Sequence, residues 1–158
     1  MVTLVKCGRP DEWEAAEALI AEYFLSFQNA VAARLTDGDR ARLTQIMRVF
    51  SQPRAALFLA VEQDDPVGCC GLCPRDEATA ELKRLYVRPA VRHGGVGIQL
   101  LDAVTEHGRR LNYDRLVLDV LPDRQAAISL YERRCWKRIP HWEGRHDMLA
   151  FELPLGDT

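Results

Sequence analysis

Residues 80–101, AELKRLYVRPAVRHGGVGIQLL, contain the change from strand to helix that decides the predicted fold. The first eight residues mix apolar and polar side chains in a short run that predicts a β-strand. Pro89 ends this strand, because proline cannot donate a hydrogen bond to a ladder. The turn that follows holds three glycines, Gly94, Gly95 and Gly97. An apolar pattern of helical spacing then begins at Val96, so the stretch predicts a strand, a glycine-rich turn and a helix.

The rest of the chain extends this pattern on both sides. We expect strands at 3–7, 55–63, 67–73, 80–87, 114–121, 136–142 and 148–155, and helices from residue 10 or 11, over 39–50, over 96–111 and over 123–134. The short turns among the second, third and fourth strands predict an antiparallel meander. The helix after the glycines predicts a crossover, so the strands on either side of it should be parallel. The chain is therefore expected to form one α/β domain of the α+β type over residues 1–158.

Composition limits the class of protein. The chain has 158 residues, of which 47% are hydrophobic and 28% charged, as in ordinary globular domains. No apolar run approaches the roughly 18 residues of a membrane helix, and the N-terminus turns acidic too early for a signal peptide, so we expect a cytoplasmic protein. A net charge of −2 argues against a strongly basic nucleic-acid binder. Acidic residues outnumber basic ones by four in residues 1–80, which fits a cationic ligand as readily as it fits solvated helix faces.

Three of the five cysteines, Cys69, Cys70 and Cys73, form a CCxxC cluster. Because side chains alternate along a strand, Cys70 should point away from the other two thiols. One metal ion could not be held by all three, and no fourth ligand lies nearby in the sequence. We therefore expect buried thiols and no metal site.

The glycine turn predicts an anion site. A helix N-terminus has unpaired N–H groups, and glycines let the backbone wrap a phosphate closely. Arg92 adds a charged donor beside them. A tight turn that merely needs positive φ would explain the glycines equally well. A Walker A loop is excluded because no Lys-Ser/Thr follows Gly97, and a dinucleotide-binding unit is disfavoured by the antiparallel strands upstream, although Asp119 is suitably placed for one.

Two motifs carry a resemblance to a known family. The run from Arg92 to Gly97 resembles the R/Q-x-x-G-x-G/A motif of the GNAT N-acetyltransferase superfamily, and AAISLYERRCW (126–136) resembles its A-x-x-L-Y-x-x-x-G-F helix. The order of strands and helices is similar over essentially the whole chain, and details resemble a subgroup of small bacterial members. The resemblance implies a GNAT-like domain with a mixed, mostly antiparallel sheet, a splayed parallel strand pair and about four flanking helices. It implies transfer of an acetyl group from acetyl-CoA to a primary amine of a small molecule or peptide, with no metal, nucleic acid or membrane as partner. It also admits a homodimer.

The resemblance assigns roles to individual residues. The pyrophosphate of acetyl-CoA would lie against Arg92, His93, Gly94, Gly95, Val96 and Gly97. The pantetheine arm would pair with the backbone of Leu85, Tyr86 and Val87. Tyr131 would be the general acid that protonates the departing sulfur, unless it is simply a core tyrosine. Glu81 would be the general base. Alternation places it on the same face of the strand as Lys83 and Leu85. It could instead be an exposed residue that pairs with a lysine, in which case water would serve as the base.

Three positions depart from the family pattern. Arg124 stands where the family has an asparagine that contacts pantetheine, and it could reach a phosphate instead. Cys135-Trp136 replaces Gly-Phe, so that Cys135 would have to accept a positive φ, although it could still pack. Ile98 replaces a polar residue. These departures keep open the alternative of a non-catalytic acyl-CoA-binding regulatory protein. The acceptor site would lie near LSFQ (25–28) and Trp142, and His141 or His146 could border it.

Overall fold

The computed structural model describes residues 1–25, 45–92 and 94–156. Its strands are β1 (Val2–Lys6), β2 (Ala56–Glu62), β3 (Asp65–Pro74), β4 (Thr79–Val87), β5 (Arg115–Val120), β6 (Lys137–Ile139) and β7 (Leu149–Pro154). Its helices are α1 (Pro10–Leu25), α4 (Ile46–Phe50), α5 (Val96–Arg110) and α6 (Gln125–Arg133), with a 3-10 turn η1 (Pro89–Val91). Among these described helices, none is both long enough and apolar enough to cross a membrane.

The order of strands and helices predicted from the sequence is confirmed. Only the end of the predicted second helix is seen, as α4, because residues 39–44 lie outside the described part of the chain. The 3-10 turn was not expected. It directly follows β4 and carries the chain from the strand toward the glycine turn.

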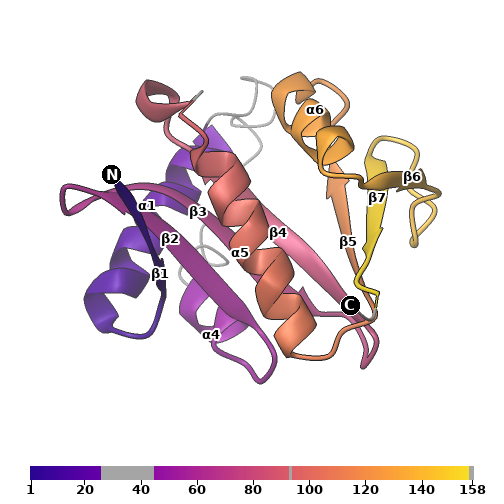
Figure 1. Cartoon of the computed structure of the whole chain (residues 1–158), viewed down its shortest axis with the longest axis horizontal. Coiled ribbons are helices and arrows are strands. Elements are labelled where there is room, and N and C mark those ends of the chain that lie inside the picture. The colour runs from indigo at the N-terminus through magenta and orange to yellow at the C-terminus, as the bar shows by residue number, and fades with distance from the viewer. Residues whose placement is uncertain (26–44, 93, 157–158) are drawn as a thin grey trace.

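All seven described strands form one sheet in the order β1-β2-β3-β4-β5-β7-β6 (Figure 1). The predicted meander is present as antiparallel pairs β2–β3 and β3–β4, and α5 crosses over to make β4 and β5 parallel. The other pairs among the described strands are antiparallel. The order of the last two strands in the sheet is the reverse of their order in the chain. β7 pairs with β5, and β6 pairs with β7 at the edge of the sheet.

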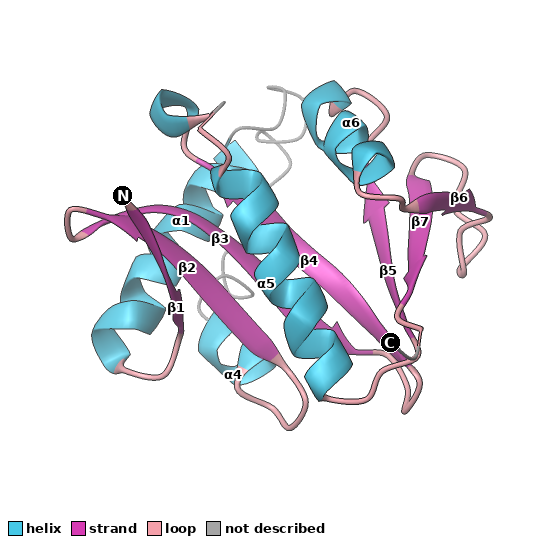
Figure 2. Ribbon diagram, in the orientation of Figure 1, coloured by secondary structure: helices cyan, strands magenta, loops and turns pink. Residues whose placement is uncertain are grey.

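Helices cover both faces of this sheet (Figure 2). On one face, apolar residues of α5 and α6 pack with strand residues into a large core cluster that includes Leu100, Val104, Leu130 and Phe151. On the other face, α1 and α4 bury a second cluster that includes Trp13, Leu19 and Phe50. The sheet therefore separates two cores, and each strand residue belongs to one side or the other.

The cysteines of β3 confirm this alternation. Cys69 and Cys73 lie in the cluster under α1 and α4, whereas Cys70 lies in the cluster under α5 and α6. All three thiols are buried, and burial raises the pKa of Cys69 to about 12. The thiols therefore remain protonated at neutral pH and act as small core side chains.

Candidate active site

The parallel ladder between β4 and β5 ends early. Its last pair joins Glu81 to Val117, although β4 continues to Val87 and β5 to Val120. Beyond Glu81 the two strands diverge, as the widening gap between their ribbons in Figure 1 illustrates. The edge of β4 that faces β5 there pairs with no described strand. An exposed strand edge of this kind can accept an extended ligand as an additional strand.

A β-bulge coincides with this divergence. On β4, Arg84 and Leu85 lie opposite the single residue Cys70 of β3, and Arg84 has a φ of 63°. Because the bulge inserts one residue, the alternation of side chains reverses beyond it. Leu85 packs against the α5 side of the sheet. The expectation that Leu85 shares the face of Glu81 and Lys83 is therefore wrong.

The glycine turn forms the N-terminus of α5. Gly95 is the N-cap residue with a φ of 81°, and no side chain caps the helix. The first amide N–H groups of α5 therefore have no partner within the helix. Both explanations of the glycines hold here, because Gly95 adopts a positive φ and also begins a helix whose N-terminus no side chain caps. His93 lies outside the described residues.

Arg92 connects the turn to the open strand. Its Nε donates a hydrogen bond to the carbonyl oxygen of Val87 at 2.9 Å, and its guanidinium lies 5.9 Å from the centre of the Tyr86 ring. The residue is exposed. The predicted phosphate-binding arginine thus lies at the end of the predicted pantetheine-binding edge.

Tyr131 of α6 is buried, with 5% of its surface exposed, and packs 5.9 Å from Trp136 and 6.0 Å from Phe151 between ring centres. Its hydroxyl makes no hydrogen bond with any described residue. Burial raises the pKa of Tyr131 well above its usual value of 10, and the neighbouring Cys70, Tyr23 and Asp119 raise it further. The phenol is therefore protonated at neutral pH and available as a proton donor.

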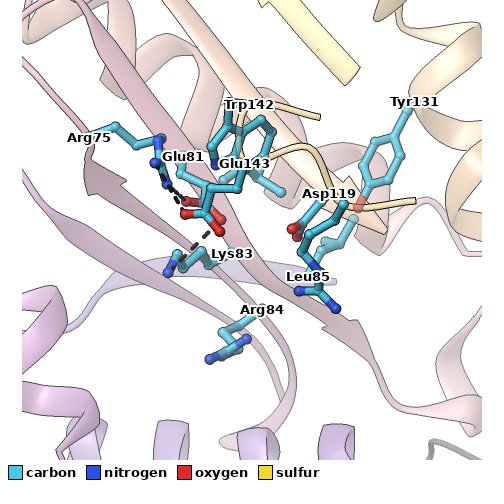
Figure 3. Close-up of a pocket in the computed structure, with 11 residues that line it drawn as sticks. Arg75, Glu81, Lys83, Arg84, Leu85, Asp119, Tyr131, Trp142 and Glu143 are labelled. Carbon is cyan, nitrogen blue, oxygen red and sulfur yellow. Dashed lines mark hydrogen bonds and ion pairs between the residues drawn. The ribbon is translucent and has the colours of Figure 1, made fainter. Parts of the chain in front are cut away.

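A cavity of about 440 Å³ lies where β4 and β5 diverge, and Tyr131 borders it (Figure 3). The structure brings three of the predicted residues to this cavity, namely Glu81, Leu85 and Tyr131. The described residues of the predicted glycine turn do not border it. They lie beyond the end of β4, at the N-terminus of α5.

Glu81 is buried and surrounded by cations. Its Oε1 accepts a hydrogen bond from Nη1 of Arg75 at 2.9 Å, and its Oε2 lies 3.9 Å from Nζ of Lys83. The dashed lines in Figure 3 mark these contacts. The alternative of an exposed Glu81 paired with a lysine is therefore wrong. Glu81 is only 7% exposed, and Arg75 is a closer partner than Lys83.

The loop between β6 and β7 closes one wall of the cavity. His141 stacks on Trp142 with ring centres 4.3 Å apart, and Arg75 lies over the Trp142 ring at 5.0 Å. Nε2 of His141 is 2.9 Å from Oδ2 of Asp119, while Nδ1 accepts the backbone N–H of Glu143 at 3.0 Å. Because Nδ1 is an acceptor, the ring proton lies on Nε2 and is donated to Asp119. The ring of His141 thus holds Asp119 at the cavity.

Two departures from the family pattern are now located. The guanidinium of Arg124 lies 5.9 Å from the ring centre of Tyr23 on α1. Cys135 has a φ of 70°, the conformation that its replacement of a family glycine required, and its side chain is exposed. Of the expected acceptor region, Trp142 borders the cavity, and residues 26–28 lie outside the described part of the chain.

The sequence did not indicate a role in this cavity for several of its charged residues. These are Arg75, Lys83, Arg84, Asp119, Glu143 and Arg145. Asp119 was noted only as a possible dinucleotide ligand near the carboxyl end of β5, and Lys83 only as a neighbour of Glu81 on β4. Arg75, Arg84, Glu143 and Arg145 come from a turn, a bulge and a distant loop, and no local pattern links them.

Comparisons with known proteins agree with this architecture. The model of the Acetyltransferase (GNAT) family matches residues 13–135. An uncharacterized N-acetyltransferase of Schizosaccharomyces pombe is 28% identical over 78% of this chain and 75% of its own length. A Xenopus tropicalis protein named probable N-acetyltransferase 14 is 34% identical over 63% of this chain and 50% of its own length.

Solved structures share the fold over nearly the full chain. A GNAT-family acetyltransferase of Staphylococcus aureus superimposes with a TM-score of 0.81 and 20% identity, covering 99% of this chain and 100% of that one. The PaiA N-acetyltransferase of Thermoplasma acidophilum, solved with coenzyme A, gives a TM-score of 0.78 at 16% identity, covering 98% and 99%. At these identities the likeness concerns the fold.

Proposed function

The chain belongs to the GNAT family of acetyltransferases, and from this premise we propose that it transfers an acetyl group from acetyl-CoA to a primary amine. The observation that carries the proposal is the early end of the β4–β5 ladder beside the uncapped N-terminus of α5. One feature suits a chain of amide groups and the other suits a pyrophosphate. Coenzyme A contains both in sequence.

The residues present fit this ligand. We assign the backbone of Leu85, Tyr86 and Val87 to the pantetheine arm, because β4 has no pairing strand on that side beyond Glu81 in the described structure. We assign Arg92, His93, Gly94, Gly95, Val96 and Gly97 to the pyrophosphate. When bound, acetyl-CoA supplies an activated thioester. The protein's part is to hold that thioester beside the cavity and to move protons there.

Transfer forms a nitrogen–carbon bond and breaks a carbon–sulfur bond, so the amine gives up one proton and the sulfur takes up another. Tyr131 is the proton donor in this proposal, because its raised pKa keeps the hydroxyl protonated and the hydroxyl is otherwise unpaired among the described residues. Glu81 takes the amine proton through a water molecule. A direct transfer is less suitable, because Arg75 and Lys83 already contact its two carboxylate oxygens.

Acetyl-CoA binding is the first test. Isothermal titration with acetyl-CoA, and with ATP and NAD as controls, should give micromolar binding to acetyl-CoA alone. Tight binding of ATP or NAD with no response to acetyl-CoA would overturn the proposal and leave the glycine turn as a site for another phosphate ligand.

Tyr131→Phe tests the chemistry separately. The variant keeps the ring that packs on Trp136 and Phe151, so we expect unchanged melting temperature and acetyl-CoA affinity. The transfer rate should fall by roughly 100-fold, the scale of general acid catalysis. Binding of acetyl-CoA without transfer to any amine, in both the wild type and the variant, would instead favour a non-catalytic acyl-CoA-binding protein.

We also propose that residues 1–158 act as one domain in the cytoplasm. This location is supported by the five cysteines, which are all unpaired thiols.

A further inference from the structure

Most charges around the cavity neutralise one another. Arg75 contacts two carboxylates, at 2.9 Å and 3.7 Å, and one of these also faces Lys83 at 3.9 Å. Arg145 makes two hydrogen bonds, at 3.0 Å and 2.7 Å, to the carboxylate of Asp147. Two cavity residues, Arg84 and Asp119, lie outside these pairs.

Arg84 is a half-buried cation with no ion pair among the described residues. It occupies the bulge of β4, and its guanidinium lies 4.9 Å from the ring centre of Phe24 on α1. The bulge directs this side chain toward α1, the face opposite α5. Arg84 therefore lies on the other side of the sheet from the helix whose N-terminus is assigned to the pyrophosphate.

Asp119 is the corresponding anion. Its close partner is Nε2 of His141 at 2.9 Å, and Nδ1 of the same ring accepts a hydrogen bond from the backbone N–H of Glu143. Arg145 exerts a longer-range attraction on Asp119, but its hydrogen bonds go to Asp147. Among the described residues, no lysine or arginine forms an ion pair with the carboxylate of Asp119, which His141 holds in place.

Arg84 and Asp119 act on a common region. Burial is the main reason that the pKa of Tyr23 on α1 is raised, but Arg84 lowers that pKa while Asp119 raises it. Both charges are therefore close enough to influence one hydroxyl. They do not pair with each other in the described structure, and both border the cavity.

We propose that the acceptor is an amino acid-like molecule that carries both an amine and a carboxylate. The carboxylate binds Arg84, whose planar guanidinium suits it, and the ammonium group approaches Asp119 before it loses its proton. This inference rests on the proposed acetyl transfer and specifies its substrate class. It adds a carboxylate to the cationic amine that the acidic N-terminal half suggested.

Matched acceptors test the carboxylate requirement. The twenty free amino acids and their C-terminal amides differ only in the charged group that Arg84 would bind. We expect kcat/KM for the best free acid to exceed that for its amide by roughly 10-fold to 100-fold, the scale of one charge-assisted hydrogen bond. Equal use of both, or preference for the amide, would overturn the inference.

Variants locate the effect. Arg84→Gln should reduce the acid-to-amide ratio to about one with acetyl-CoA affinity unchanged, since Arg84 lies away from the glycine turn. Arg145→Gln makes the same chemical change at the same cavity and should leave the ratio unchanged, because Asp147 already neutralises Arg145. Loss of the ratio in Arg145→Gln but not in Arg84→Gln would contradict the assignment.

Asp119→Asn tests the ammonium site. Because both the acid and the amide carry the amine, this variant should raise KM for both alike.

The two proposals fail differently. If the protein binds acetyl-CoA and acetylates amines but uses no free amino acid, the inference about Arg84 is wrong and the transferase stands. If the protein neither binds acetyl-CoA nor turns it over, the proposed function itself is wrong, and the inference falls with it.

Discussion

Replacing Cys135 with glycine should stabilise the protein. Cys135 follows the end of α6 with a φ of 70°, a conformation that places Cβ too close to the following carbonyl oxygen. The backbone there forms a Schellman cap, because the N–H of Trp136 donates to the carbonyl of Tyr131 at 3.0 Å and the N–H of Cys135 donates to that of Glu132 at 3.2 Å. Glycine is the residue that this position ordinarily takes.

The magnitude follows from two opposing terms. Removing Cβ relieves about 1–2 kcal/mol of conformational strain. Glycine also gives the unfolded chain more freedom, which offsets about 0.4–1 kcal/mol of this gain. No packing is lost, since Cys135 is exposed. We therefore expect the free energy of unfolding to rise by roughly 0.5–1 kcal/mol, which for a domain of this size raises Tm by about 1–4 °C.

Urea unfolding and calorimetry under reducing conditions measure this difference, with an unchanged m-value as the check that only stability has moved. Cys135→Ala is the matched control, because it removes the thiol but keeps Cβ. Its stability should stay within about 0.5 kcal/mol of the wild type. If alanine stabilises as much as glycine, the thiol and not the backbone is responsible, and the argument from strain fails.

Two further predictions concern ionisable groups. In Glu81→Gln, the transfer rate near pH 7 should fall and the residual rate should rise with pH, because the amine must then lose its proton unaided; a pH–rate profile parallel to the wild type would exclude Glu81 as the base. Burial, followed by the charges of Lys6 and Arg110, lowers the pKa of His107 in the folded protein. The unfolded chain therefore takes up this proton at a higher pH than the folded chain does. The free energy of unfolding then falls as the pH drops through about 6.5, the usual pKa of histidine. His107→Gln should lose less Tm than the wild type between pH 7.5 and pH 5.5 in thermal melts.

The sequence predicted those features that local patterns determine. Alternation along 67–73 correctly separated Cys70 from Cys69 and Cys73, because a strand has a fixed period of two. The replacement of a family glycine by Cys135 correctly indicated a positive φ, since the cap geometry does not depend on the side chain. Periodicity and glycine placement likewise gave the order of the elements.

The sequence did not reveal the bulge on β4. Arg84 is not a glycine, so nothing in ELKRLYV marks the residue at which the alternation reverses, and Leu85 was assigned to the wrong face. The charged wall of the cavity was missed for a different reason. Arg75 and Glu143 meet only because β7 enters the sheet beside β5, and such long-range pairing leaves no local signal.

The bulge links the two halves of the proposed site. A regular β4 would keep Leu85 on the face of Glu81 and would give residue 84 the opposite orientation. With one residue inserted, Leu85 turns to the α5 side while the guanidinium of Arg84 reaches Phe24 on the α1 side. The same irregularity lies where the ladder to β5 has already ended. The bulge therefore lies beside the open edge of β4 that is proposed for acetyl-CoA. The same bulge presents Arg84, the cation proposed to select the acceptor. Acetyl-CoA and the acceptor would thus meet across β4.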